Sequence, residues 1–203
     1  MRLVSVDLQN DFVSPGGVHY RGQPCVDFVG ETLIPFCRDN GVPVAEIVSD
    51  YRTEGGNEAD TTCVPGQWGY QSAIQEELKL APPWVKASIG PTWVRDGGGD
   101  SGAVPGPVRS DPEGFTSWLR SALGPADDGG PVIIVGLVLE VCVLATLIEI
   151  KLRGYPAQLM LEGVDTYDGD PARKQAFLDT LAGFWGPPVS WADCVPVLSA
   201  ARS

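Results

Sequence analysis

Short runs of apolar residues recur along the chain, and polar residues, glycine or proline close each of them. Parallel strands covered on both faces are nearly continuous in apolar residues, so these runs predict buried strands. The predicted strands are LVSV (3–6), VPVAEIVSD (42–50), WVKAS (84–88), PVIIVG (131–136) and AQLMLEGVD (157–165). The segment PVSWADCVPVL (188–198) predicts a further short strand or a turn.

Segments with hydrophobic residues at helical spacing separate the predicted strands. The predicted helices cover 26–41, 112–124, 140–156 and 170–184. Asp170 and Pro171 are suited to the N-cap and the first position of the last helix, and Gly41 is suited to end the first. Pro35 predicts that the first helix kinks or ends early, because proline lacks the N–H that a helix interior uses.

The alternation of strands and helices predicts one α/β domain over 1–203, with a parallel sheet covered on both faces. Two long loops interrupt it, at 51–70 and 89–112. The second holds too many glycines and prolines for a regular element, and loops of this length in compact domains are commonly lids or binding loops. We expect it to cover the crevice of its own or a neighbouring subunit and to shape substrate choice. The alternative is a disordered surface insertion.

The net charge limits which partners the protein can bind, and the cysteines indicate its cellular compartment. The 203-residue chain has a formal net charge of -12, which opposes binding to nucleic acid and to anionic lipid. No apolar run reaches the roughly 20 residues that span a bilayer, and no charged-then-apolar leader opens the chain. The five cysteines are scattered without a CxxC pair, which favours a reducing compartment. We therefore expect a cytoplasmic protein with a small-molecule substrate and neither nucleic acid nor membrane as a partner.

Three ionisable residues fall at the carboxyl ends of predicted strands, where open α/β sheets form their crevices. Asp7 ends the first strand, Lys86 ends the third, and Cys142 opens the helix after the fourth. A helix N-terminus and a nearby ammonium favour a thiolate, and a carboxylate can take the thiol proton. His19 is the only histidine, so the base must come from another residue type. The alternatives are an inert core cysteine, a turn-capping aspartate and a solvated lysine.

The segments VDLQNDF and GLVLEVCVLAT, together with the strand lysine, resemble the cysteine hydrolases of the isochorismatase-like superfamily. The resemblance extends from Leu3 to about Leu198 and implies a three-layer α/β/α, Rossmann-like fold with a mostly parallel sheet. It also implies an Asp-Lys-Cys triad at Asp7, Lys86 and Cys142, a cis peptide from Leu137 to Val138, and an oxyanion hole of the Val138 and Cys142 N–H groups. Members of the family are commonly dimers or tetramers, so a homo-oligomer is expected.

The chain departs from the nicotinamidases of this family at their metal-binding Asp-x-His segment. The matching segment here is SDYRTEGG, in which Asp50 is present but Arg52 replaces the histidine. Zinc prefers imidazole or thiolate ligands, so we expect neither a metal nor another cofactor. Arg52 offers a planar fork to a substrate carboxylate or carbonyl, or is an ordinary loop arginine. Other substrate-binding candidates are aromatic residues of loops bordering the crevice: Phe12, Trp68, Tyr70 and Trp93.

These observations favour a metal-independent amidohydrolase that cleaves a small amide, ureide or carbamoyl C–N bond through a thioester on Cys142. An alternative within the same fold is an isochorismatase-type ether hydrolase, in which Asp7 is the acid and Cys142 is a bystander. A third possibility is a catalytically degenerate subunit that only binds a ligand or a partner.

Overall fold

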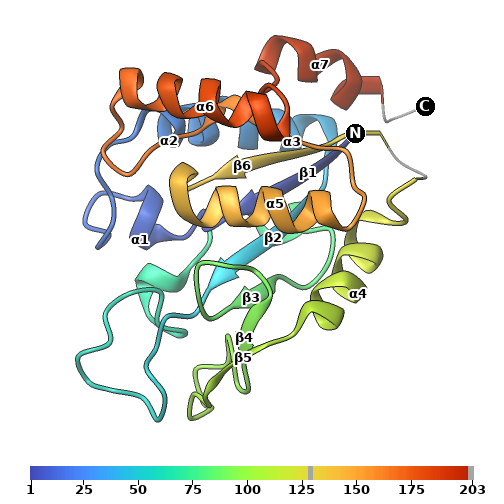
Figure 1. The fold of residues 1–203 in the computed structure, drawn as a ribbon. Helices are drawn as coiled ribbons and strands as arrows, with labels where there is room; N and C mark the ends of the chain where they lie inside the picture. Colours follow the sequence, from blue (N-terminus) through green and yellow to red (C-terminus); the bar gives the residue numbers. More distant parts are fainter. Residues whose placement is uncertain (128–129, 201–203) are drawn as a thin grey trace.

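The computed structural model describes residues 1–127 and 130–200, so the end of the predicted 1–203 domain lies outside the described residues. Its central sheet is parallel throughout, in the order β3-β2-β1-β6-β7 (Figure 1). The strands are β1 (Arg2–Val6), β2 (Val44–Ser49), β3 (Trp84–Lys86), β6 (Val132–Gly136) and β7 (Ala157–Val164). Each lies within or overlaps a predicted run, and the parallel sheet is confirmed.

Helices cover both faces of the sheet and complete a three-layer α/β/α architecture (Figure 1). They are α1 (Asn10–Val13), α2 (Pro24–Phe28), α3 (Ile34–Asn40), α4 (Pro112–Leu123), α5 (Leu144–Leu152), α6 (Pro171–Trp185) and α7 (Trp191–Ala200). Residues of α4, α5 and α6 pack in one hydrophobic core, and residues of α3 and α7 pack in the other. Strand β6 contributes to both cores, because Ile133 and Ile134 point to opposite faces.

Local sequence signals set most helix boundaries as predicted. The Asp170 side chain accepts a hydrogen bond from the Arg173 N–H at 2.8 Å, and Gly41 ends α3 with a φ of 61°. Pro35 was predicted to kink its helix or to end it early, and the structure contradicts the early end. A π-helical turn, η1 (Val29–Leu33), directly precedes α3, and the Ile34 N–H bonds to the Val29 carbonyl. Its wider spacing of hydrogen bonds lets the helix continue past the proline to Asn40.

The segment 188–198 was predicted as a strand or turn, but most of it belongs to helix α7, with Pro196 inside the helix. Cys194 and Leu198 are both buried in one core. Residues four apart share a helix face, so this pair buries an apolar stripe against the sheet. The burial of that stripe outweighs the local preference against proline. The predicted strand is limited to a bridge between Val189 and Met160.

The glycine- and proline-rich segment 89–112 contains regular structure, contrary to the prediction. Strands β4 (Trp93–Arg95) and β5 (Val108–Ser110) form an antiparallel pair with Val94 opposite Arg109. Gly97 and Gly99 have φ values of 71° and 80°, which are accessible to glycine without strain and let the tip of the hairpin fold back. The segment is therefore a hairpin with an irregular tip.

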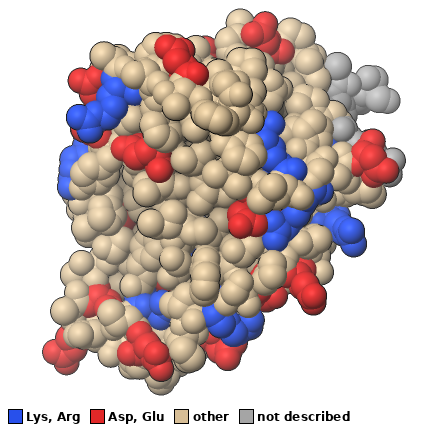
Figure 2. All heavy atoms as spheres, viewed as in Figure 1, with Lys and Arg blue, Asp and Glu red and all other residues tan. Residues whose placement is uncertain are grey.

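Acidic side chains are spread over the face of the molecule shown in Figure 2, whereas several basic side chains gather at the right of the view. The spread of acidic side chains accords with the formal net charge of -12. Among the described residues, no helix is both long and apolar enough to cross a membrane.

Ionisation of the buried thiols predicts a loss of stability in alkaline solution. Burial raises the pKa of Cys37 to about 12 and the pKa of Cys142 and Cys194 to about 11, and it also raises the pKa of Cys25 and Cys63. Above a pH of about 9 the unfolded chain releases protons that the folded chain retains. The free energy of unfolding then falls as pH rises, by about 1.4 kcal/mol per pH unit for each thiol. Denaturant midpoints measured in reductant at about pH 8 and about pH 10 test this expectation, and equal midpoints contradict it.

Candidate active site

The polar residues of the candidate site come from the carboxyl ends of neighbouring strands. Asp7 follows β1, Ser49 ends β2, Lys86 ends β3, and Cys142 lies in η4 (Leu139–Val143), the π-helical turn after β6. Strand β1 pairs with β2 on one side and with β6 on the other. The connections that follow β1 and β6 therefore diverge at the carboxyl end of β1. A crevice forms where connections diverge in this way. The structure therefore brings Asp7, Lys86 and Cys142 together.

Asp7 is completely buried and has a φ of 53°, an uncommon conformation for a residue other than glycine. One of its carboxylate oxygens accepts a hydrogen bond from the Ser49 hydroxyl at 2.7 Å. The other is 2.8 Å from Lys86 Nζ. The residue with the left-handed backbone conformation at the end of β1 is thus also the residue whose carboxylate contacts Ser49 with one oxygen and Lys86 with the other.

Gly136 allows the turn that carries Cys142 to approach β1. Its φ is 129°, and a Cβ at this position would lie 2.0 Å from the carbonyl oxygen of Val6. The next residue, Leu137, donates its N–H to the same carbonyl at 3.1 Å. The peptide between Leu137 and Val138 is cis, as the family resemblance implied. A glycine is required here by both space and backbone conformation.

The Val138 carbonyl accepts the first hydrogen bonds of the turn η4. The N–H groups of Val141 and Val143 both bond to this carbonyl, at 3.1 and 3.2 Å. Among the described residues, the Val138 N–H donates to no backbone carbonyl, and it retains its capacity to bind an oxygen. The Cys142 N–H lies between those of Val141 and Val143 in sequence.

Lys86 has no exposed surface and lies at the centre of the site. Its Nζ is 2.6 Å from the Ser49 hydroxyl, 2.8 Å from the Tyr51 hydroxyl and 2.8 Å from the Asp7 carboxylate. It is also 3.4 Å from Cys142 Sγ. Burial, the largest single influence, lowers the pKa of Lys86, but the interactions with Asp7, Cys142 and Tyr51 together more than reverse this, so the pKa is raised and the ammonium stays charged.

Cys142 is 4% exposed, and the pKa of its thiol is raised above the ordinary value. Burial and then the charge of Asp7 raise its pKa, Lys86 and a hydrogen bond with Tyr51 act in the opposite direction, and the net result is a pKa of about 11. A thiol therefore lies next to a carboxylate, and the sulfur becomes nucleophilic only when its proton leaves.

A cavity of about 250 Å³ opens above the thiol. Its lining side chains are aliphatic, aromatic or, at Cys142, a thiol: Phe12, His19, Tyr51, Ile89, Val138, Val141, Cys142 and Tyr167. The Phe12 and His19 rings stack with centroids 5.1 Å apart. Burial lowers the pKa of His19, which favours the neutral imidazole. Phe12 is thus the predicted substrate-binding aromatic that the structure places at the thiol.

Arg52 lies away from this cavity and is buried against its neighbour Asp50. The guanidinium makes a two-pronged contact with the Asp50 carboxylate, at 3.0 and 2.7 Å. It also donates to the carbonyls of Gly97 and Ala103, at 3.1 and 3.0 Å, while Asp50 accepts from the Gly99 N–H. The fork that sequence reasoning offered to a substrate therefore holds the tip of the β4–β5 hairpin. Ile89 is the residue of the 89–112 segment that lines the cavity.

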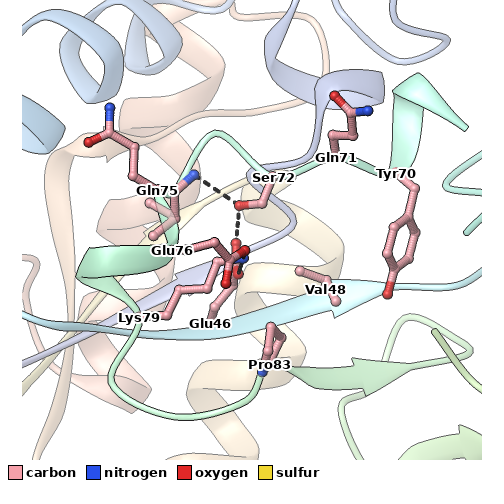
Figure 3. A pocket seen from close by; sticks show the side chains of 10 residues that line it. Glu46, Val48, Tyr70, Gln71, Ser72, Gln75, Glu76, Lys79 and Pro83 are labelled. Carbon is pink, nitrogen blue, oxygen red and sulfur yellow. Dashed lines mark hydrogen bonds and ion pairs between the residues drawn. The ribbon is translucent and has the colours of Figure 1, made fainter. Parts of the chain in front are cut away.

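The other aromatic candidates lie outside the cavity at Cys142. Trp68 and Trp93 are 48% and 46% exposed. Tyr70 lines a separate hollow of about 440 Å³ beside β2 (Figure 3). In that hollow the Ser72 hydroxyl donates to the buried Glu46 carboxylate, and Lys79 is 3.3 Å from the same side chain. The hollow thus surrounds a buried ion pair rather than the reactive thiol.

The sequence analysis did not identify Ser49 and Tyr51, which contact Lys86, nor four further residues of the cavity wall: His19, Ile89, Val141 and Tyr167. Ser49 had a usable signal, since it is a polar residue at the end of a predicted strand. Tyr51 opens a loop, and no sequence pattern fixed the direction of its side chain. Within residues 1–127 and 130–200, no group of three or more His, Cys, Asp or Glu side chains is placed to hold a metal ion.

Replacing Ser49 by alanine is expected to destabilise the protein by about 1–3 kcal/mol, because buried Asp7 and Lys86 each lose a hydrogen-bond partner. Ser5 supplies a matched control on β1. It is equally buried, and its hydroxyl has no hydrogen-bond partner in the part of the chain that the structure describes. Urea denaturation should show a loss of stability for Ser49→Ala and little change for Ser5→Ala. Equal stability of the two variants would show that Ser49 does not support the site.

Comparison with protein-family models and with curated proteins finds no match to the sequence. Solved structures do match. Nicotinamidase from Bacillus subtilis is 17% identical with a TM-score of 0.64, covering 93% of this chain and 98% of that one. A pyrazinamidase of Pyrococcus horikoshii in complex with zinc is 19% identical (TM-score 0.62, 94% and 98% covered). A cysteine hydrolase from Pseudomonas syringae pv. phaseolicola is 17% identical (TM-score 0.61, 99% and 93% covered). The chain therefore has the fold of isochorismatase-like hydrolases.

Proposed function

We propose that the chain is a metal-independent cysteine amidohydrolase that cleaves a small amide, ureide or carbamoyl C–N bond. The observation that carries the proposal is the arrangement of Asp7, Lys86 and Cys142 at the floor of an apolar cavity. The shared fold with hydrolases supports the reaction class. Arg52 supports independence from a metal, because its guanidinium already neutralises the one carboxylate that matches the metal-binding segment.

The proposed reaction begins with transfer of the Cys142 proton to Asp7, and the sulfur then attacks the substrate carbonyl carbon. The resulting oxyanion accepts hydrogen bonds from the Val138 and Cys142 N–H groups, each such donor contributing about 3 kcal/mol to transition-state stability. The C–N bond breaks, and Asp7 returns the proton to the leaving nitrogen as ammonia or an amine. Water then attacks the thioester, Asp7 accepts its proton, and the carbonyl product leaves as the proton returns to sulfur. Lys86 stays charged throughout and stabilises the two anions in turn.

The cavity supports a small, neutral acyl group, because aliphatic and aromatic side chains form its walls. The proposal therefore includes a small-molecule substrate and no cofactor. A cytoplasmic location is supported by the cysteines, all five of which are free. Assembly into a dimer or tetramer stays a prediction.

Rapid-quench mass spectrometry tests the proposal directly. A panel of small amides, ureides and carbamoyl compounds is screened for ammonia release, and the best substrate is mixed with enzyme and quenched in acid. We expect a mass increase equal to the acyl group on the peptide that contains Cys142. Turnover without an adduct, and without protection of Cys142 from iodoacetamide by substrate, would favour the ether hydrolase in which the thiol is a bystander. A thiol that alkylates no faster than a free model thiol, with no turnover, would favour a non-catalytic subunit.

A further inference from the structure

The Tyr51 hydroxyl occupies a position between the ammonium and the thiol of the candidate site. Its oxygen is 2.8 Å from Lys86 Nζ and 3.4 Å from Cys142 Sγ. Tyr51 also lines the cavity, so the contact lies on the side from which a substrate approaches. No pattern in the sequence assigned this residue a role. Among the described residues, it is the one cavity-wall side chain whose hydroxyl contacts the sulfur.

The donors of Lys86 show how the hydroxyl is oriented. An ammonium donates hydrogen bonds and accepts none, so the Tyr51 oxygen, 2.8 Å from Nζ, accepts a hydrogen bond from Lys86. Nζ also contacts the Ser49 hydroxyl at 2.6 Å, the Asp7 carboxylate at 2.8 Å, the Ser88 carbonyl at 3.2 Å and Cys142 Sγ at 3.4 Å, so its three N–H groups are shared among more than three neighbours. Because the Tyr51 oxygen accepts from Lys86, its own hydrogen is free to point to the sulfur. Acceptance from a cation also polarises the hydroxyl and makes it a stronger donor.

We propose that Tyr51 is a fourth catalytic residue, which accepts a hydrogen bond from Lys86 and donates one to Cys142, and so transmits the charge of Lys86 to the sulfur. The hydrogen bond to sulfur strengthens when Asp7 takes the thiol proton and negative charge appears on Sγ. No proton leaves Tyr51 at any step. Burial and the charge of Asp7 raise the pKa of the Tyr51 phenol, so it remains a donor across the working range. The inference rests on the proposed cysteine chemistry.

The charged and titratable groups around Cys142 set the background for a test. Asp7 and Lys86 face the thiol from the ends of β1 and β3, and buried Cys63 lies close enough to interact with it electrostatically. His19 lines the same cavity. Substituting Tyr51 leaves all four in place, so a change in the thiol pKa reports the hydroxyl alone.

The test is the pH dependence of iodoacetamide alkylation at Cys142, followed by peptide mass spectrometry and needing no substrate. Hydrogen bonds to charged groups correspond to about one to two pKa units, so Tyr51→Phe should raise the apparent pKa of Cys142 by that amount. The variant has fewer thiolates, but each is more nucleophilic. Its alkylation rate near neutral pH should therefore fall by about 3- to 10-fold. Cys142→Ser supplies the background from the other thiols.

Tyr167→Phe is the matched control, because Tyr167 lines the same cavity and its hydroxyl accepts from Arg21. Its alkylation profile should coincide with that of the wild type. Tyr51→3-fluorotyrosine retains the shape of the residue while making the phenol a stronger donor, so it should lower the apparent pKa of Cys142. This variant also decides the matter if Tyr51→Phe does not fold. Unchanged profiles for Tyr51→Phe, or a fluorotyrosine variant that does not lower the apparent pKa, overturn the role of Tyr51.

The outcome is separable from that of the proposed function. If no amide is hydrolysed, or if Cys142→Ala retains turnover, the amidohydrolase fails while the alkylation profiles remain measurable. If amides are hydrolysed through Cys142 and the profiles of wild type and Tyr51→Phe coincide, the amidohydrolase stands and the hydrogen bond from Tyr51 has no effect on the thiol.

Discussion

Replacing Cys142 by alanine is expected to lower kcat/KM for the best small amide by about 10⁴-fold or more, since the variant has no atom to form the thioester. Ammonia release measured on the purified variant checks this expectation. Cys37→Ala is the control, because Cys37 is another buried cysteine but lies in α3, away from the cavity. A folded Cys37→Ala protein should retain full turnover. Undiminished ammonia release by Cys142→Ala would eliminate the thioester route.

Replacing Lys86 by methionine is expected to reduce the free energy of unfolding by about 3–5 kcal/mol, because it leaves the Asp7 carboxylate buried without a counter-ion. Both side chains of the pair have no exposed surface, so water cannot take the place of the ammonium. Urea denaturation measures the loss. The same variant should also lose nearly all turnover, since neither the carboxylate nor the thiolate is then stabilised.

The double variant Asp7→Asn with Lys86→Met separates the charge effect from the loss of packing. It removes both charges together, and replacing a buried ion pair by neutral residues of similar volume is often close to neutral for stability. We expect it to recover most of the stability that Lys86→Met loses and to remain inactive. A double variant that is no more stable than Lys86→Met would show that packing, rather than an unpaired charge, accounts for the loss.

The sequence predicted which residues lie at the carboxyl ends of the strands. It did not predict which side chains contact one another there. Asp7, Lys86 and Cys142 each follow an apolar run, and parallel strands place such residues at one edge of a sheet. Tyr51 and Arg52 are adjacent in the sequence but serve different neighbours: Tyr51 contacts Cys142, and Arg52 holds the hairpin tip. Which neighbour each reaches depends on the path of a loop, and loop paths follow from tertiary contacts rather than from local periodicity.

The dependence on tertiary contacts also explains why two secondary-structure predictions were wrong. The hairpin of β4 and β5 has strands of three residues each, too short for an alternating pattern to register above the surrounding glycines and prolines. Helix α7 contains Pro196, which local preference assigns to a turn. In both places contacts with distant residues determine the structure.

Part of the cavity wall comes from segments that carry none of the three reactive groups. Strand ends and the turn after β6 hold Asp7, Lys86 and Cys142, whereas His19, Ile89 and Tyr167 reach the cavity from separate connections between secondary-structure elements. Connections tolerate sequence change far better than buried sheet residues do. A duplicated gene with this architecture can therefore diversify its ligand preference one connection at a time while inheriting an unaltered reaction centre. Directed evolution of such a scaffold is best confined to those three connections.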